Sequence, residues 1–377
     1  MRQSVRLGRV AGIPVGAHWS VAVILAIITE VLGLSVLPAA LPHQPAAVYW
    51  GVAVAGAVAF LASLAAHEFA HAIVARRNGV GVRSITLWML GGVAELEGDP
   101  PSPGADLRIA LAGPVTSLLA GGVFVGAAAL IGYAGGPKVG AVAAVWLGVM
   151  NAVLAVFNLL PGAPLDGGRV LRAVLWHRWG NWGRAERAAA QSGRVLGAAI
   201  AGLGLAEMLF GGLVNGLWLM LIGWFLASAA SAEQNAAAAT TALAGVRVAD
   251  VMITHPEPAP GWATAAGFID QVAAHSAQSV FPVVGFDGQL AGIVTAGQLA
   301  RIPPGQRAET RLDQIATPVP PEYLAAPDDP AGPLAARRPL GGEIAAIVLT
   351  HDRVTGLVRA ADLQRMLRCR RLTGAGV

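Results

Sequence analysis

Two histidines in one apolar stretch of this 377-residue chain have the spacing of a metal site. His67, Glu68 and His71 form the pattern His-Glu-x-x-His. Residues at positions i and i+4 share one face of a helix, so both imidazoles can bind one zinc ion. Glu68 lies beside them and can accept a proton from a water molecule held at the metal. The alternative interpretation is a pair of packed histidines on a buried helix.

Two histidines leave a tetrahedral zinc ion short of protein ligands, because a catalytic zinc usually takes three. The best candidate for the third ligand is Asp166, in the sequence Phe-Asn-Leu-Leu-Pro-Gly-Ala-Pro-Leu-Asp-Gly-Gly at 157–168. Pro161, Gly162 and Pro164 break the helix that is expected before it, so the carboxylate could turn inward at the helix end. The alternative is an interfacial aspartate that caps a loop helix.

The elements that must position these residues are membrane spans. Charged residues are 13% of the chain, against about 25% in an ordinary soluble protein. Residues 1–232 carry only 23 of the 48 charges. Six stretches are apolar enough to cross a bilayer, which takes about 20 residues each. They lie at 19–40, 49–75, 109–134 and 139–160, with two more inside 196–232 that meet near Gly211–Gly216.

The distribution of arginine predicts how these spans are oriented. Arginines precede the first span and lie between spans two and three and between spans four and five. In the loops on the opposite side, the only lysine or arginine is Lys138. By the positive-inside rule, the N-terminus, the arginine-rich loops and the C-terminal tail are cytoplasmic. We therefore expect a multi-pass protein of the plasma (inner) membrane. Ionisable groups inside a bilayer are costly and usually mark a function, which strengthens the metal-site interpretation.

The two motifs together resemble the site-2 protease family of intramembrane zinc metalloproteases. The resemblance covers roughly residues 1–232 and implies that His67, His71 and Asp166 bind zinc and that Glu68 is the general base. It also implies that Asn158 steadies the substrate carbonyl or the developing oxyanion, a role that suits an amide donor. The alternative for Asn158 is a hydrogen bond between helices, which polar residues in spans often make.

The segment Val82–Gly98 alternates in polarity in places and predicts a cytoplasmic-side β-hairpin with Ser84–Met89 and Val93–Glu97 as its arms. The site-2 family has a membrane-reentrant β-loop in this region, which implies that Gly91 and Gly92 help to hold the substrate. An exposed strand edge can bind an extended substrate through main-chain hydrogen bonds. The alternative is an ordinary surface hairpin.

Gly113, Pro114 and Ser117, at the start of the third span, resemble a family Gly-Pro-x-x-[Ser/Asn] element. Small residues allow helices to approach closely, so we interpret this element as packing.

The C-terminal part of the chain repeats itself. After a small-residue linker at 233–245, residues 246–309 and 310–371 each contain a strand, a polar turn, a second strand and a short helix. The two copies resemble a CBS-domain pair, a module that commonly binds adenine nucleotides. The fold class is thus a polytopic α-helical membrane domain of about six spans, followed by an α+β CBS-pair domain.

The ribose- and phosphate-binding motif of such modules is incomplete in both copies. The first copy keeps Thr295 but has Gln298 where the acid belongs, and the second keeps Asp362 but has Arg359 in place of the hydroxyl. An adenine nucleotide bound through Thr295 and Asp362 is therefore doubtful. A regulatory or dimerisation platform without nucleotide is at least as well supported.

The leading hypothesis is an intramembrane zinc metalloendopeptidase that binds one Zn²⁺ per chain and is modulated by the CBS pair. By the resemblance, its substrate is a single-pass membrane protein such as an anti-sigma factor, already trimmed outside the membrane. The alternatives are a CBS-gated transporter or channel without protease activity, and a non-catalytic receptor on a protease scaffold. The arginines form no basic block, so no nucleic-acid partner is expected. The single cysteine, Cys369, excludes an intramolecular disulfide and a cysteine-based zinc site.

Overall fold

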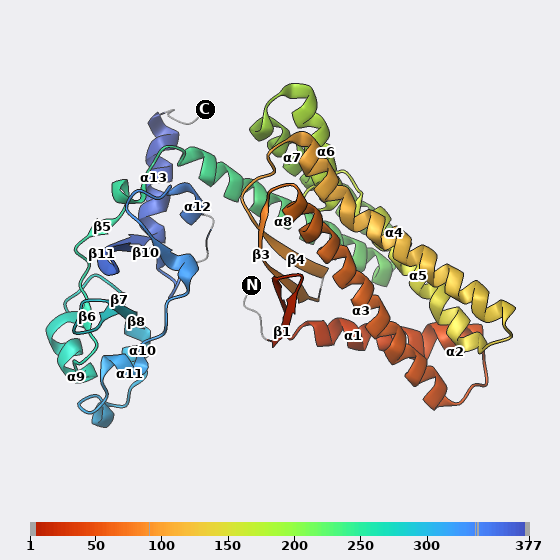
Figure 1. Cartoon of the computed structure of the whole chain (residues 1–377), viewed down its shortest axis with the longest axis horizontal. Helices are drawn as coiled ribbons and strands as arrows, with labels where there is room; N and C mark the ends of the chain where they lie inside the picture. The colour runs from red at the N-terminus through yellow and green to blue at the C-terminus, as the bar shows by residue number, and fades with distance from the viewer. Residues whose placement is uncertain (1–4, 90, 336, 338, 374–377) are drawn as a thin grey trace. The chain divides into compact units, whose positions relative to one another are not determined.

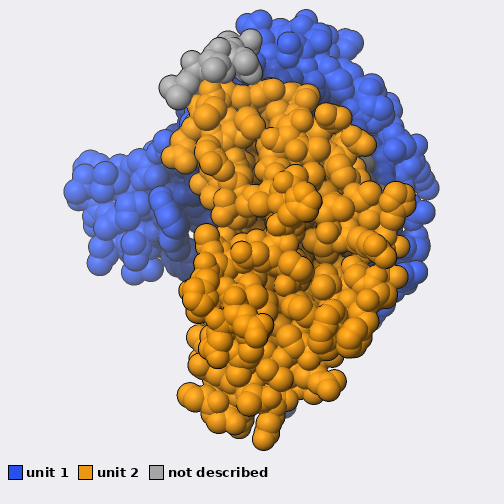
Figure 2. All heavy atoms as spheres, turned by 90° about the vertical axis from the view of Figure 1, so that its left-hand side faces the viewer, with its two compact units in different colours: residues 1–233 blue, residues 234–377 orange. Residues whose placement is uncertain are grey.

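The computed structural model describes residues 5–89, 91–335, 337 and 339–373. It divides the chain into two compact units, Met1–Glu233 and Gln234–Val377, which Figure 2 shows in blue and orange. Among the described residues of the chain, six helical segments are long and apolar enough to cross a membrane. This finding confirms the predicted fold class of the first unit.

We call the first unit the membrane unit. Most of it is helical, and its helices follow one another in chain order (Figure 1). They are α1 (Val21–Glu30), η1 (Val31–Val36), α2 (Leu37–Ala40), α3 (Ala46–Arg77), α4 (Pro103–Tyr133), α5 (Lys138–Asn158), α6 (Asp166–Trp179), α7 (Trp182–Leu209) and α8 (Leu213–Ala242). The first three segments follow one another without a break and form one membrane-length run, Val21–Ala40. The π-helical turn η1 lies in the middle of that run.

Two helix boundaries differ from the sequence-based expectation. The fifth long helix, α7, begins at Trp182 rather than near residue 196, because the side chain of Asn181 caps it by accepting a hydrogen bond from the Arg184 amide at 2.9 Å. The turn expected near Gly211 is present, and Gly211 itself has a φ of +102° that favours glycine. Helix α8 continues to Ala242, so the predicted linker at 233–245 is mainly helical.

Glycine allows α7 and α8 to pack with their backbones close together. A Cβ on Gly204 would lie 2.5 Å from the Gly216 carbonyl oxygen, and one on Gly197 would lie 2.6 Å from the Ala227 nitrogen. Because lipid tails are as apolar as the side chains, close backbone packing rather than the hydrophobic effect holds such helices together.

The membrane unit also contains a four-stranded sheet. Its strands are β1 (Val5–Val10), β2 (Ile13–Ala17), β3 (Gly81–Trp88) and β4 (Gly91–Glu97), in the order β1-β2-β3-β4. The predicted hairpin is confirmed as β3 and β4, with Trp88 opposite Gly91. Strands β1 and β2 were not predicted from the sequence. They form a second hairpin, and its strand β2 pairs in parallel with β3. Strand β4 is an edge of the sheet, so one side of its main chain has no strand partner among the described residues.

The second unit contains two copies of the predicted α+β arrangement. Its short elements are η2 (Val248–Asp250), β5 (Ile253–Thr254), β6 (Ala259–Pro260), α9 (Ala265–Phe268), η3 (Ile269–Ala273), η4 (Pro304–Gln306), α11 (Leu312–Ile315), η5 (Pro321–Tyr323), β9 (Leu324–Ala325) and α12 (Gly332–Ala335). Its longer elements are β7 (Val280–Val284), β8 (Leu290–Thr295) and α10 (Ala296–Arg301) in the first copy, and β10 (Ile344–Thr350), β11 (Arg353–Arg359) and α13 (Ala360–Thr373) in the second.

We call this unit the tandem repeat. In each copy an antiparallel strand pair is followed by a helix: β7, β8 and α10 in the first, and β10, β11 and α13 in the second. The copies share a core, because Val280 and Ile293 of the first pack in one cluster with Ile344, Ile347 and Leu357 of the second. The predicted α+β fold class of this part of the chain is therefore confirmed.

Candidate metal centre

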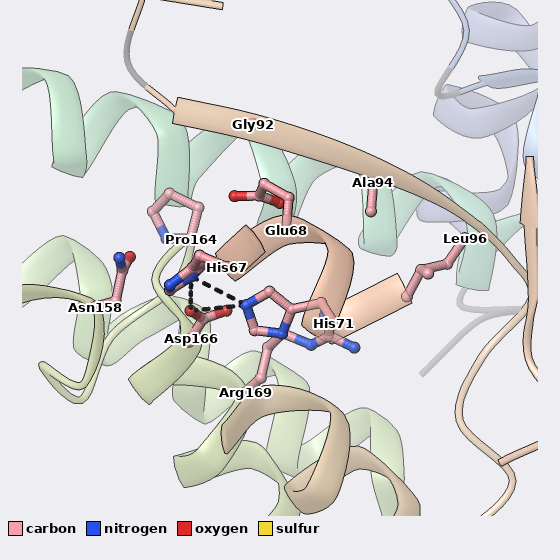
Figure 3. A pocket seen from close by; sticks show the side chains of 10 residues that line it. All are labelled: His67, Glu68, His71, Gly92, Ala94, Leu96, Asn158, Pro164, Asp166 and Arg169. Carbon is pink, nitrogen blue, oxygen red and sulfur yellow. Dashed lines mark hydrogen bonds and ion pairs between the residues drawn. The ribbon is translucent and has the colours of Figure 1, made fainter. Parts of the chain in front are cut away.

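Three ligand-bearing side chains converge in the membrane unit (Figure 3). His67 and His71 lie one turn apart on α3, and Asp166 is the first residue of α6. The two histidine Nε2 atoms are 3.2 Å apart, and each lies 3.2 Å from Oδ2 of Asp166. His67 and His71 are buried, with relative exposures of 2% and 6%. The three atoms form an equilateral triangle in the protein interior.

The size of this triangle fits a zinc ion. Tetrahedral bonds of about 2.0–2.1 Å place neighbouring ligand atoms about 3.3–3.4 Å apart, close to the observed separation. Three ligands on one face of a tetrahedron leave the fourth position free, which is the arrangement of a catalytic zinc site. Zinc also prefers nitrogen and oxygen donors of these types. The residues present therefore fit the ion that the sequence predicts.

Hydrogen bonds to the remaining ring nitrogens orient both histidines. Nδ1 of His71 lies 2.7 Å from the carbonyl oxygen of Ile109 on α4. Because a carbonyl oxygen can only accept, neutral His71 carries its proton on Nδ1 and directs the Nε2 lone pair toward the centre of the triangle. Nδ1 of His67 lies 2.9 Å from Oγ of Ser117, also on α4. Outer hydrogen bonds of this kind fix the ring tautomer at metal sites.

Gly113 of α4 provides space beside the two histidine nitrogens of the triangle. A Cβ at this position would lie 2.2 Å from Nε2 of His71 and 2.4 Å from Nε2 of His67. Any side chain there would collide with both nitrogens that could bind the metal. From the sequence, Gly113 and Ser117 were expected to be packing residues, but Gly113 also leaves space for the two histidines and Ser117 forms a hydrogen bond with His67. Their spacing of four residues on one helix face pointed to a shared partner.

The loop between α5 and α6 positions Asp166. Glycines at 167 and 168 allow the first turn of α6 to pack directly on this loop, since a Cβ on Gly167 would lie 2.2 Å from the Leu160 carbonyl oxygen. A Cβ on Gly168 would lie 2.4 Å from the Ala163 nitrogen. The Asp-Gly-Gly sequence thus places a carboxylate at the start of a helix that is pressed against the preceding loop.

Glu68 and Asn158 line the same cavity as the three ligands. The cavity has a volume of about 160 Å³, and strand β4 passes along one side of it (Figure 3). Gly92 of β4 approaches Glu68 so closely that a Cβ would lie 2.2 Å from its Cγ atom. Gly91 begins the strand with a φ of +143° and is not among the residues that line the cavity. Of the two predicted glycines, only Gly92 contributes to its wall.

A buried ionic group lies next to this cavity and was not found by sequence reasoning. Asp106 of α4 is fully buried and accepts two hydrogen bonds from Arg172 of α6, each 2.9 Å long. Burial alone would lower the pKa of Arg172, but the hydrogen bonds and the charge of Asp106 raise it. Arg169 lies one turn earlier on α6, lines the cavity and has Nη2 3.5 Å from Oδ1 of Asp106. The spacing of 166, 169 and 172 on one helix face was the sequence signal for this group.

The two candidate nucleotide-binding residues of the tandem repeat have local partners. Thr295 is the N-cap of α10, and its hydroxyl accepts a hydrogen bond from the backbone N–H of Gln298 at 3.1 Å. In return, the side-chain oxygen of Gln298 accepts from the backbone N–H of Thr295 at 2.8 Å. This reciprocal pair is a capping box. Asp362 is the third residue of α13, the position that Gln298 has in α10, and it is paired with Arg359 at 2.8 Å and also with Arg365. The hydrogen bond from Arg359 lowers the pKa of Asp362.

Comparisons with known proteins match both parts of the chain. The model of Peptidase family M50 matches residues 55–140 and 137–200. Rip3 of Mycobacterium tuberculosis, named as a zinc metalloprotease, is 44% identical over 99% of this chain and 95% of its own length. The solved site-2 protease of Methanocaldococcus jannaschii is 29% identical and covers 61% of this chain and 94% of its own, with a TM-score of 0.41. CBS domains of a Streptococcus pneumoniae transcriptional regulator are 16% identical and cover 32% of this chain and 98% of their own, with a TM-score of 0.28.

Proposed function

This chain belongs to peptidase family M50, a family of zinc metalloproteases, and on that premise we propose that it hydrolyses peptide bonds in or near the transmembrane segments of membrane-bound substrates. The observation that carries the proposal is the triangle of His67, His71 and Asp166 in one cavity with Glu68. The cavity belongs to a unit whose long helices are suited to a bilayer, which supports a substrate that lies in the membrane.

His67, His71 and Asp166 would hold the zinc ion. When bound, zinc polarises a substrate carbonyl and activates a water molecule as nucleophile. Glu68 takes the proton from the attacking water and passes it to the leaving amine, as a general base and then a general acid. Asn158 lines the same cavity and donates its amide to the carbonyl oxygen on which negative charge develops.

Strand β4 supports the binding of an extended substrate. It is an edge strand, so its free main-chain groups can pair with a further strand, and it runs beside the cavity (Figure 3). The close approach of Gly92 to Glu68 brings this edge next to the general base. A substrate paired with β4 would present its main chain, rather than a particular side chain, to the metal centre. We propose a single-pass membrane protein, such as an anti-sigma factor already trimmed outside the membrane, as the substrate.

The orientation that we propose places the metal centre toward the cytoplasm. The chain is a multi-pass membrane protein, and the arginine distribution supports a cytoplasmic N-terminus and tail in the plasma (inner) membrane. At a rise of about 1.5 Å per residue, His71 lies about 8 Å from Arg76, at the cytoplasmic end of α3. Water for hydrolysis would therefore enter from the cytoplasmic side.

We propose that the tandem repeat modulates proteolysis as a CBS pair and could join two copies of the chain as a homodimer. Adenine nucleotide binding is the less favoured form of this regulation. Thr295 and Asp362, which would have to contact the ribose and phosphates, already form hydrogen bonds within their own copies.

Substitution of the general base tests the proposed function. Full-length wild type and Glu68→Gln are reconstituted in liposomes with a single-span substrate peptide, and cleavage is followed by mass spectrometry. We expect wild type to cleave and Glu68→Gln to be slower by about 10²–10⁴-fold, the range for loss of a general base. Both proteins should hold one zinc ion per chain, because Glu68 is not a ligand. Equal cleavage by the two proteins would contradict the mechanism.

A further inference from the structure

Arg169 is a cationic side chain in the metal-centre cavity that the mechanism above does not use. It lies on α6, one turn after Asp166, and its side chain lines the cavity with 25% of its surface exposed. Figure 3 shows Asn158 and Arg169 on different sides of the three ligands. A substrate that lies across the metal centre would therefore have a donor on either side.

Much of the hydrogen-bonding capacity of Arg169 is unused. Its Nε atom is buried and has no hydrogen-bond partner among the described residues. A guanidinium group has five N–H donors and no acceptor, so it can serve only groups that accept. The hydrogen bond that its Nη2 donates to Oδ1 of Asp106 is long, at 3.5 Å. Because the side chain is 25% exposed and lines the cavity, its remaining guanidinium N–H donors can meet an acceptor that a ligand supplies.

The ion pair with Asp106 does not account for Arg169. Arg172 already binds the Asp106 carboxylate through two hydrogen bonds of 2.9 Å and lies closer to the carboxylate. Arg172 also has Glu186 at 3.8 Å and stacks over the ring of Trp182. Arg172 thus neutralises the buried carboxylate. Arg169 lines the metal-centre cavity and also a neighbouring pocket that contains Glu186 and Glu233.

A substrate cleaved at this site has acceptors that need partners. A transmembrane helix must unwind at the bond that is cut, and the unwound turn frees main-chain carbonyl groups. Inside a bilayer each unsatisfied group of this kind costs several kcal/mol, because no water replaces its lost partner. The edge of β4 can satisfy one side of an extended segment, and the other side requires further donors.

We propose that Arg169 binds main-chain carbonyl oxygens of the unwound substrate segment and so positions the scissile peptide bond over the metal centre. This inference rests on the proposed function and adds a substrate-binding residue to it. Because main-chain carbonyls are common to all sequences, Arg169 would select substrates by how readily they unwind rather than by their side chains.

The test measures binding without cleavage. Full-length Glu68→Gln protein in liposomes binds two fluorescein-labelled single-span peptides, one with Gly-Pro at its cytoplasmic end and one of Leu and Ala only, which stays helical. Arg169→Met is added to this background and should weaken binding of the Gly-Pro peptide about 10- to 100-fold, the range for hydrogen bonds to a charged group. Arg169→Lys should be intermediate, because lysine keeps the charge but loses the planar fork.

A matched control is Arg178→Met, which removes an exposed arginine from the same helix and should bind like its parent. Zinc content should be unchanged in all variants, and the Leu-Ala peptide should bind without dependence on Arg169. With Glu68 intact, Arg169→Met should raise KM more than it lowers kcat.

Equal binding of the Gly-Pro peptide by Arg169→Met and its parent would overturn the proposal. A loss of zinc would also overturn it, because Arg169 would then support the metal centre. An equal loss for both peptides would exclude the unwound main chain as the ligand. These outcomes are separate from failure of the proposed function, which would appear as equal cleavage by wild type and Glu68→Gln.

Discussion

The candidate site residues of the membrane unit and of the tandem repeat differ in where their partners lie along the chain. In the membrane unit, acceptor atoms from residues 67, 71 and 166 meet at 3.2 Å, although 95 residues separate His71 from Asp166. In the tandem repeat, Thr295 pairs with Gln298 and Asp362 with Arg359, each within one helical turn. The first arrangement brings together possible metal ligands from distant parts of the chain, and the second pairs Thr295 and Asp362 with donors three residues away.

This difference separates a ligand site from a structural one. Two imidazole nitrogens and a carboxylate oxygen that converge at about 3.2 Å match the spacing of zinc ligands, which favours a metal site. A capping residue that finds its partner three residues later stabilises the end of a helix and needs nothing else. The same residue types therefore have different meanings in the two units, and the geometry of their partners decides between them.

Filling the space beside the two histidine nitrogens should produce the largest effect. We expect Gly113→Ala to lose its zinc and to cleave substrate more than about 100-fold more slowly, beyond the usual effect of losing an outer hydrogen bond. The reason is that its Cβ would lie within 2.4 Å of both histidine Nε2 atoms. Elemental analysis of the purified protein gives the zinc content. Gly122→Ala on the same helix is the control, since a Cβ there meets nothing within 4 Å. Full zinc occupancy in Gly113→Ala would show that the metal centre does not need the space that Gly113 leaves.

Removing the outer hydrogen bond of His67 should have a smaller effect on the same centre. Ser117→Ala is expected to bind zinc about 10- to 100-fold more weakly, because the ring of His67 loses the partner that orients it. Competition with a chelator measures this affinity. Thr116→Ala is the matched control, because the Thr116 hydroxyl donates only to the Ala112 carbonyl of its own helix. Equal zinc affinities in the two variants would show that Ser117 only packs.

Removing the charge of Asp362 should affect the tandem repeat alone and have the smallest effect. The folded-state pKa of Asp362 is lowered, so its ion pair stabilises the fold above the unfolded pKa of about 3.9 and this stabilisation is lost as the pH falls through the folded value. Hydrogen exchange of α13 in the full chain should show less protection in Asp362→Asn at neutral pH and no difference from wild type in acid.

Zinc content and cleavage by Asp362→Asn should match wild type. A change in either would show that this local ion pair is coupled to the metal centre. Adenosine triphosphate should leave the exchange of α13 unchanged in both proteins, and protection that depends on Asp362 would assign this aspartate to a nucleotide site instead.

Much of the fold could be predicted because its elements follow from local composition. The apolar stretches predict membrane helices, since an apolar segment of sufficient length has few stable alternatives in a bilayer. The β1–β2 hairpin was missed because its residues read as a charged flank before the first span, and only pairing with β3 makes them part of a sheet. The early start of α7 depends on the Asn181 cap, which a search for apolar residues does not detect.

The sequence by itself determined the histidine spacing, the neighbouring glutamate and the aspartate after the helix-breaking loop, because a short motif fixes which residue types share a helix face. Only the tertiary structure decided that Ser117 and the Ile109 carbonyl orient the histidines, that Gly113 leaves room beside them, and that Arg169 lines the same cavity. These contacts join α3, α4 and α6, which are distant along the chain. Such contacts depend on helix packing, whereas a ligand motif depends on the pitch of a single helix.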